Sequence, residues 1–288
     1  MKRLVVILVV FSFFLWERSI SQEVFAEDFE VSEITDVFTQ WSDVRNSKGI
    51  ELSEDVPAES AGNKSMAITY VSGSDNGAHL YKKLPQGFKQ IHARFYVKFL
   101  TRNAPLHHFV RIGGYFPSTS YPQGTAGMRS SGDDFFSTGI ESPHVDDWNW
   151  GFYSYWKDMH GSGNGKFWGN TFHPQSSLEL PLNEWVCVEF MVRLNDPVGS
   201  SNGEQAFWIN GKKILHIKPG VTKMVREGGR FLESKSGEIF EGFQWRTTTD
   251  LEINYFWLNY YMTGGVTGSV DKVLIDDIVI SERYIGPL

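Results

Sequence analysis

The sequence predicts an all-β fold, a two-sheet antiparallel β-sandwich of the jelly-roll type. Apolar and polar residues alternate with a period of two in several segments, and helical periodicity is nearly absent. Turns that contain glycine, proline or asparagine separate these segments, with no strand–helix–strand alternation that would indicate a parallel sheet. Many strands joined by such turns favour an antiparallel sandwich.

Composition limits the classes of protein to consider. The chain has 288 residues, 41% of them hydrophobic and 21% charged, which is enough to bury a full core and excludes global disorder. A single cysteine, Cys187, excludes an internal disulfide and any site with several cysteine ligands, and its apolar surroundings predict a buried, inert thiol. The net charge of −7 argues against a nucleic-acid partner. Aromatic residues make up 15% of the chain, which fits a wide core or a surface that stacks on sugars.

The N-terminus has the pattern of an export signal. Two basic residues precede an apolar run, 4–16, which is shorter than the roughly 20 residues of a membrane-spanning helix. Small residues favour cleavage after Ser21, with an uncleaved anchor as the alternative. We therefore predict a signal peptide at 1–21 and a single β-jelly-roll domain at 22–288. The protein is expected to be secreted or periplasmic, free of the membrane after processing, monomeric, and more acidic than the full chain.

Period-two alternation identifies the main strands, predicted at 91–100, 185–194, 251–262 and 273–280. Asn210-Gly211 stands between two strand-like runs and predicts a tight hairpin, because a type I′ turn requires positive φ at both central residues. The least regular stretches either rim a cleft or cover the surface; they are 42–64, 115–134 and 218–237.

The segment 148–157 carries the most information about function. Alternation places three tryptophans and Phe152 on one face, which predicts that Trp148, Trp150 and Trp156 belong to the core. The other face carries Asn149, Gly151, Tyr153, Tyr155 and Lys157. This face is either simply solvated or the floor of a groove for a sugar chain. Tyrosine rings stack on pyranose rings while their hydroxyls bond to sugar oxygens.

A second candidate stretch is His107-His108-Phe109-Val110-Arg111. Strict alternation places His107 and Arg111 on one face and His108 among aliphatic residues on the other. Arg111 either binds a substrate carboxylate or forms an ordinary ion pair. We take Arg111, His107 and Asn149 as candidate substrate-binding residues, with structural roles as the alternative.

Several stretches together resemble a known family, the concanavalin A-like (LamG-like) jelly rolls. Within it the chain resembles the polysaccharide lyases of families fourteen and twenty, which act on alginate and glucuronan. The matching stretches are 92–99, the Gly-Gly pair after Arg111, Tyr153-Ser-Tyr155, 184–195, and the closing segment 275–281. The chain departs from the family pattern after Gly114, where it reads Tyr115-Phe-Pro-Ser, and at 136–141, where no arginine is present.

The resemblance implies β-elimination on a uronate-containing polysaccharide. Such a reaction needs a group that neutralises the carboxylate, a base, and an acid for the leaving oxygen. We assign Tyr155, Lys157 and Tyr153 as candidate catalytic residues, with Lys157 lowering the pKa of a phenol, and Arg111 or His107 as the neutralising group. The alternative is a lectin-like module that binds a glycan without chemistry. Paired-carboxylate hydrolysis is disfavoured, because no stretch matches the Glu-x-Asp-x-x-Glu pattern by which retaining glucanases on this fold resemble one another.

Carboxylates near the first and last strands suggest a structural Ca²⁺. Terminal strands are often neighbours in a jelly roll, so Glu30 and Asp277 are our candidate ligands, together with backbone carbonyls. Ordinary surface acids are the alternative. No motif for an organic cofactor is present.

Overall fold

The computed structural model describes residues 23–142, 148–162, 164–227 and 229–288. The predicted signal peptide at 1–21 lies outside these residues. No helix within the described ranges is long and apolar enough to cross a membrane.

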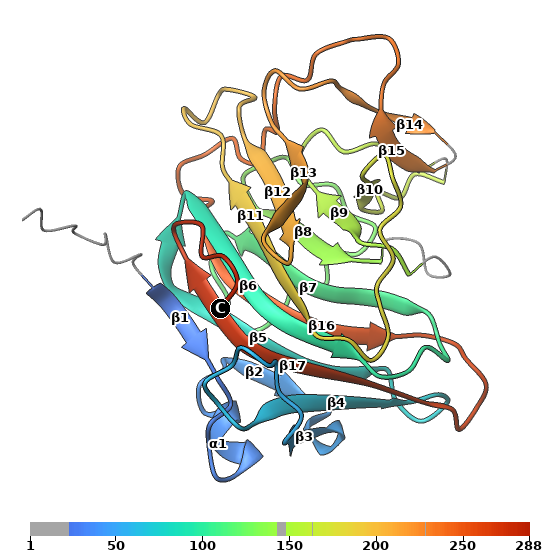
Figure 1. Ribbon diagram of the computed structural model, residues 1–288. Helices are drawn as coiled ribbons and strands as arrows, with labels where there is room; N and C mark the ends of the chain where they lie inside the picture. Colours follow the sequence, from blue (N-terminus) through green and yellow to red (C-terminus); the bar gives the residue numbers. More distant parts are fainter. Residues whose placement is uncertain (1–22, 143–147, 163, 228) are drawn as a thin grey trace, which may run out of the picture.

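Two packed sheets form the body of the molecule and confirm the predicted β-sandwich (Figure 1). Sheet A has the order β13 (Lys212–Ile217), β12 (Glu204–Ile209), β11 (Val186–Arg193), β6 (Gln90–Phe99), β17 (Val270–Ser281), β4 (Ser65–Val71) and β3 (Ile50–Ser53), with β1 (Glu23–Glu27) beside β17. Sheet B has the order β14 (Met224–Glu227), β15 (Arg230–Glu233), β10 (Asn170–Phe172), β9 (Gly151–Tyr155), β8 (Phe135–Glu141), β7 (Leu106–Tyr115), β16 (Ile253–Met262), β5 (Gly77–Phe88) and β2 (Asp43–Arg45). A short helix α1 (Ile34–Phe38) and a 3₁₀ turn η1 (Ser47–Gly49) complete the described elements.

The strands expected from alternation are present at β6, β11, β16 and β17. The predicted hairpin joins β12 to β13, and both turn residues have positive φ, 49° at Asn210 and 75° at Gly211. Two of the three irregular stretches contain short strands, β2 and β3 in 42–64 and β14 and β15 in 218–237. The segment 116–134 contains no strand.

The core lies between the two sheets. Trp148, Trp150 and Phe152 are buried there, as predicted from the face they share in the sequence, and Trp156 is half-buried against the same cluster. Each such side chain removed from water contributes on the order of 2 kcal/mol. The tryptophans of this segment therefore stabilise the sandwich and leave the opposite face of β9 for other contacts.

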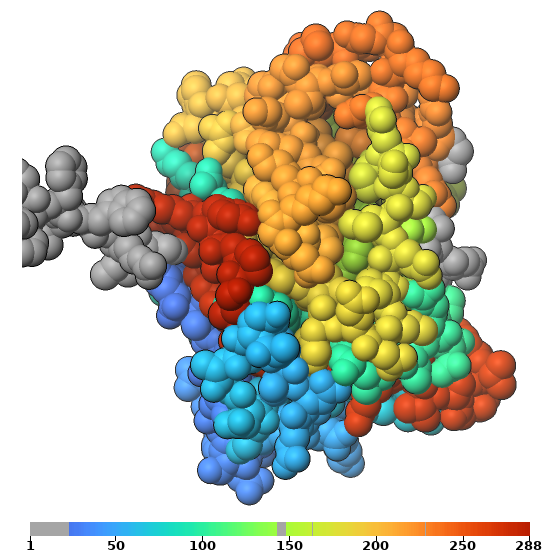
Figure 2. Space-filling model, viewed as in Figure 1, coloured from blue at the N-terminus to red at the C-terminus, as the bar shows by residue number. Residues whose placement is uncertain are grey.

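The outer face of sheet A is covered by the C-terminal segment 282–288. Glu189 on β11 is buried and accepts hydrogen bonds from the backbone N–H groups of Ile285 (3.0 Å) and Gly286 (2.8 Å). The same carboxylate lies 2.8 Å from Nδ1 of His92 on β6. Figure 2 shows this segment, in red, against the orange β12–β13 region, where the rings of Tyr284 and Trp208 are 5.2 Å apart. This cover explains why the polar face of β6 is buried.

Candidate functional site

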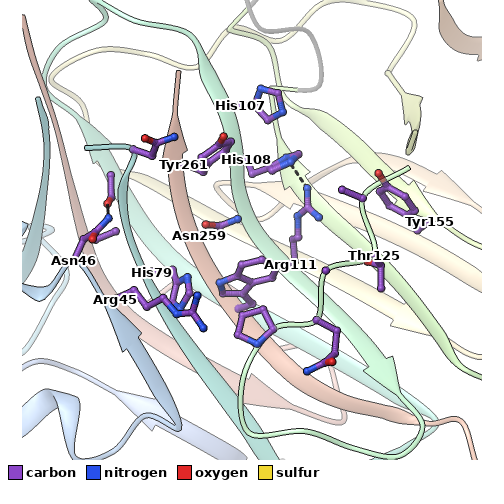
Figure 3. Close-up of a pocket in the computed structure, with 18 residues that line it drawn as sticks. Arg45, Asn46, His79, His107, His108, Arg111, Thr125, Tyr155, Asn259 and Tyr261 are labelled. Atoms are coloured by element: carbon purple, nitrogen blue, oxygen red, sulfur yellow. Dashed lines mark hydrogen bonds between the residues drawn. The ribbon is translucent and has the colours of Figure 1, made fainter. Parts of the chain in front are cut away.

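A groove of about 610 Å³ lies on the outer face of sheet B (Figure 3). Side chains of β2, β5, β16, β7 and β9 form its floor, and residues 122–126 form part of its wall. The stretch 115–134 was expected either to rim a cleft or to cover the surface, and its residues 122–126 border this groove. The lining includes side chains that can bind a ligand through charge, hydrogen bonds or ring stacking: Arg45, His79, His107, His108, Arg111, Tyr155, Trp257, Asn259 and Tyr261.

Strand register sets the order of side chains across the floor. Arg111 on β7 pairs with Trp257 on β16 on one side and with Gly139 on β8 on the other. Gly139 in turn pairs with Tyr153 on β9. A Cβ atom at Gly139 would lie 2.9 Å from Cγ of Arg111, so the glycine provides the space that the arginine occupies. The guanidinium carbon of Arg111 lies 5.5 Å from the centre of the Tyr153 ring.

A buried carboxylate lies behind the arginine. Glu141 at the end of β8 is fully buried, and its Oε1 is 3.6 Å from Nη2 of Arg111. Its Oε2 accepts a hydrogen bond of 3.1 Å from the backbone N–H of Phe109. Although burial opposes ionisation, the charge of Arg111 holds the pKa of Glu141 below its ordinary value. Glu141 thus orients Arg111 without lining the groove.

His108 contacts the same arginine. Its Nδ1 lies 2.5 Å from Nη2 of Arg111 and 3.2 Å from Oε1 of Glu141. Burial, followed by the charge of Arg111, lowers the pKa of His108 to about 4, so the ring is neutral at pH 7. A guanidinium only donates, so Nδ1 is an acceptor and the ring proton belongs on Nε2.

The placement of the two histidines corrects the sequence analysis. Strict alternation put His108 on the core side, yet its ring contacts Arg111 and both histidines line the groove. The pairing of β16 with β7 shifts register between Leu258 and Tyr261, which breaks the two-residue period at this point. Burial also lowers the pKa of His107, so this ring is neutral and supplies hydrogen bonds rather than a counter-charge.

The predicted tyrosine pair lies beside Arg111. The hydroxyls of Tyr153 and Tyr155 are 3.5 Å apart, and Tyr155 lines the groove. Burial raises the pKa of Tyr153, and the neighbouring Arg111 only partly opposes this effect. Tyr153 is therefore a protonated hydrogen-bond donor at neutral pH.

Two predicted residues lie elsewhere. β9 ends at Tyr155, so alternation does not continue to Lys157, which lines a separate hollow with Arg129, and its Nζ is 2.5 Å from Asp158. Asn149 forms an isolated bridge with Glu179 and does not line the groove. The structure thus brings together Arg111, His107, Tyr153 and Tyr155, without Lys157 and Asn149.

The wall of the groove is anchored through Tyr115, the last residue of β7. Its ring stacks on Tyr255 at 4.8 Å, and its hydroxyl accepts a 3.2 Å hydrogen bond from the backbone N–H of Gln123. Its backbone makes two further hydrogen bonds with the side chain of Asn254. These contacts fix the wall segment 122–126 beside the strands that form the floor of the groove.

Several groove residues were missed by the sequence analysis. In β16, Trp257, Asn259 and Tyr261 follow one another at a spacing of two and all line the groove. The same alternation is present in the sequence at 251–262, where it predicts a strand but does not indicate that one face lines a groove. Arg45 and His79 had no such signal, because they lie on strands far apart in the sequence.

The charge of the lining differs from that of the chain. Among the described residues, the lining contains two arginines and three histidines and no aspartate or glutamate. The whole chain carries a net charge of −7. The groove therefore presents guanidinium groups, which can bind anions, on an acidic protein.

The acids proposed for Ca²⁺ lie away from the groove, Asp277 on β17 of sheet A and Glu30 in the segment after β1. Oε1 of Glu30 accepts hydrogen bonds from the backbone N–H groups of Asn63 (2.7 Å) and Lys64 (2.6 Å). Asp277 occupies an irregular part of β17 with φ of 48° and donates its N–H to Asp276 over 2.8 Å. Oδ2 of Asp276 and Oδ2 of Asp277 are both buried without a hydrogen-bond partner from residues 23–142, 148–162, 164–227 or 229–288. No group of three or more metal-ligating side chains is assembled among the described residues.

Comparisons with known proteins establish the fold. No protein-family model matches the sequence, and no curated protein matches it. Alginate lyase Aly36B superposes with a TM-score of 0.58 at 12% identity, covering 91% of this chain and 98% of that chain. An Aly36B variant in complex with alginate trisaccharide gives 0.59 at 12% identity, covering 91% and 99%. Alginate lyase vAL-1 from Chlorella virus gives 0.57 at 14% identity, covering 91% and 100%. The lyase-like jelly-roll fold implied by the sequence resemblance is confirmed.

Proposed function

We propose that this protein binds a uronate-containing polysaccharide in the groove and cleaves it by β-elimination. The observation that carries the proposal is the lining, whose described residues present the arginines Arg45 and Arg111 and no carboxylate on an otherwise acidic chain. A similar structure, the Aly36B variant, is described in complex with alginate trisaccharide. The absence of carboxylates from the described lining also disfavours hydrolysis by an acid–base pair of carboxyl groups.

In this mechanism Arg111 binds the uronate carboxylate. A guanidinium at this position stabilises the negative charge that develops when the proton α to the carboxylate is removed. The neutral ring of His108 adds a donor through Nε2. Glu141 holds Arg111 in place through the ion pair of 3.6 Å.

Tyr155 transfers the proton. As a phenolate, its oxygen takes the C5 proton, the C5–H electrons form the C4=C5 double bond, and the C4–O bond breaks with its electrons on the leaving oxygen. The same phenol then protonates that oxygen, and Tyr153 supports it across 3.5 Å.

The test is the absorbance of unsaturated uronate products after mixing with a panel of polymers. The panel contains polymannuronate, polyguluronate, glucuronan and polygalacturonate, with cellulose as the neutral control. We expect absorbance to rise with at least one uronate polymer and not with cellulose. No rise with any polymer between neutral and alkaline pH would contradict cleavage.

The second candidate function is binding without cleavage. One observation favours it, because burial raises the pKa of Tyr153 and keeps it a donor rather than a base. In that case the panel gives no absorbance change while the protein is retained on a column of immobilised uronate polymer. The absorbance change therefore distinguishes the two functions, because only cleavage produces it.

We also propose a structural Ca²⁺ at the start and end of the sandwich. The unpartnered buried oxygens of Asp276 and Asp277 fit a hard cation that prefers oxygen ligands, and Glu30 adds negative charge nearby. Addition of Ca²⁺ to chelator-treated protein is expected to raise the thermal midpoint, and Asp277→Asn to reduce the response. An unchanged midpoint in the unsubstituted protein would contradict the site.

A further inference from the structure

A second arginine stands at the end of the groove away from the tyrosines. Arg45 is the last residue of β2, lines the groove, and has a side chain that is 62% exposed. Its Nε donates to Oδ2 of Asp43 over 3.2 Å, and no hydrogen bond to its terminal nitrogens is present among the described residues. Asp43 therefore fixes Nε of Arg45, whereas Nη1 and Nη2 are available to bind a ligand.

A histidine fixes the carboxylate that holds this arginine. Nε2 of His79 lies 2.9 Å from the same Oδ2 of Asp43. Burial lowers the pKa of His79, so the neutral ring donates this hydrogen bond. The His79 ring stands edge-on to Trp257 with centres 5.6 Å apart, which ties Asp43 to the groove floor. Asp43 is thus positioned behind the guanidinium, as Glu141 is behind Arg111.

The strand order separates the two arginines. Arg45 pairs with His79, and His79 with Asn259, along one row of the floor. Arg111 belongs to the next row, beside Trp257, with β5 and β16 lying between β2 and β7. Three spacings of about 4.8 Å place the two backbones roughly 14 Å apart, farther than the width of one sugar ring.

The floor between the arginines offers further polar contacts. The indole Nε1 of Trp257 is buried and has no hydrogen-bond partner within the described part of the chain. Asn259, two residues farther along β16, also lines the groove. An unpaired donor of this kind is normally satisfied by water or a ligand.

We infer that Arg45 binds the carboxylate of a second uronate unit, several positions along the same glycan from the unit held by Arg111. The inference rests on the proposed function of the groove and names its substrate class more closely. A glycan with consecutive uronates can engage both arginines. A glycan with isolated uronates between neutral sugars engages one.

The test compares Arg45→Gln with the unsubstituted protein on di- to hexasaccharides of alginate and of glucuronan. The readout is the dissociation constant, or KM where the glycan is cleaved. We expect Arg45→Gln to leave disaccharides unchanged and to weaken the hexasaccharide about tenfold or more, the size of one charge-assisted hydrogen bond. Lys48→Gln is the matched control, because Lys48 is an exposed cation nearby that does not line the groove.

Carboxyl-reduced hexasaccharides separate charge recognition from general packing. On these neutral ligands the difference between Arg45→Gln and the unsubstituted protein is expected to disappear. Equal values for the two proteins at every length would overturn the second subsite and leave the proposed function standing. No binding of any uronate oligomer by the unsubstituted protein would overturn both.

Discussion

Arg111 and Gly139 are direct partners across β7 and β8, and the missing side chain of the glycine is what admits the arginine to the groove floor. A methyl group at Gly139 would lie 2.9 Å from Cγ of Arg111, 3.1 Å from the Val110 carbonyl and 3.2 Å from Oε2 of Glu141. The site therefore depends on Gly139, which has no side chain that could bind or transform a ligand.

Substitution Gly139→Ala is expected to weaken uronate binding and cleavage by about tenfold or more. The added methyl group displaces the guanidinium from Glu141, and a misplaced group loses its charge-assisted contacts. The measurement is kcat and KM, or the dissociation constant, beside a thermal midpoint. Gly199→Ala is the control, because a Cβ there has nothing within 4 Å. Full function in Gly139→Ala would show that the position of Arg111 does not matter.

The two conservative replacements of Arg111 are expected to differ in stability. Arg111→Gln leaves Glu141 as a buried carboxylate without its cation and should cost about 3 kcal/mol of unfolding free energy. Arg111→Lys keeps a charge but loses the planar fork, so it should retain more stability while still losing activity. Denaturant unfolding and the cleavage assay measure the two effects. Equal stabilities would argue against the ion pair with Glu141.

Tyr155 and Lys157 are two residues apart and have different expected roles. Tyr155→Phe should reduce the elimination rate by a factor of about a hundred or more, because it removes the proton-transfer group. Lys157→Gln should leave the rate nearly unchanged, because Lys157 lies outside the groove and contacts Asp158. The elimination rates of both variants under saturating substrate test these two roles. A large loss in Lys157→Gln with full rate in Tyr155→Phe would reverse the assignment.

His108 makes stability depend on pH in a defined window. Its pKa in the folded protein is lowered to about 4, against roughly 6.5 in an unfolded chain. Between these values the unfolded chain binds a proton that the folded chain does not, so unfolding free energy falls as pH falls. The contribution is at most about 1.4 kcal/mol per pH unit.

Denaturant unfolding at several pH values between 5 and 6.5 tests this effect. His107 and His79, whose pKa values are also lowered by burial, act in the same direction and remain in the variant. His108→Asn is therefore expected to flatten the slope without abolishing it. An unchanged slope would show that His108 is not buried as a neutral ring.

The sequence predicted the sandwich because period-two alternation is a local property of each strand. It also predicted that Trp148 and Trp150 are core residues and that Asn210-Gly211 forms the hairpin turn. Tyr153 and Tyr155 are site candidates because alternation places them on one face of a strand, and Arg111 is a candidate because it stands near the end of another strand, before Gly113-Gly114. The predictions of strands and core residues share one condition, an unbroken alternation.

The failures occur where alternation breaks or where pairing is not local. A register shift beside Tyr261 placed His108 against Arg111, which strict alternation excluded. β9 ended before Lys157, so that residue left the groove face. Arg45 and His79 joined the site through the pairing of β2 with β5, which no short-range pattern indicates. Long-range register is thus the information that the sequence alone did not supply.

The position of Trp257 has a practical consequence. Its indole is only partly buried and touches the groove, whereas Trp150 and Trp245 are fully buried elsewhere. A glycan that enters the groove changes the surroundings of this indole and leaves those two unchanged. Intrinsic fluorescence, corrected with a Trp257→Phe protein, therefore gives a label-free titration signal for any ligand of the groove, whether or not it is cleaved.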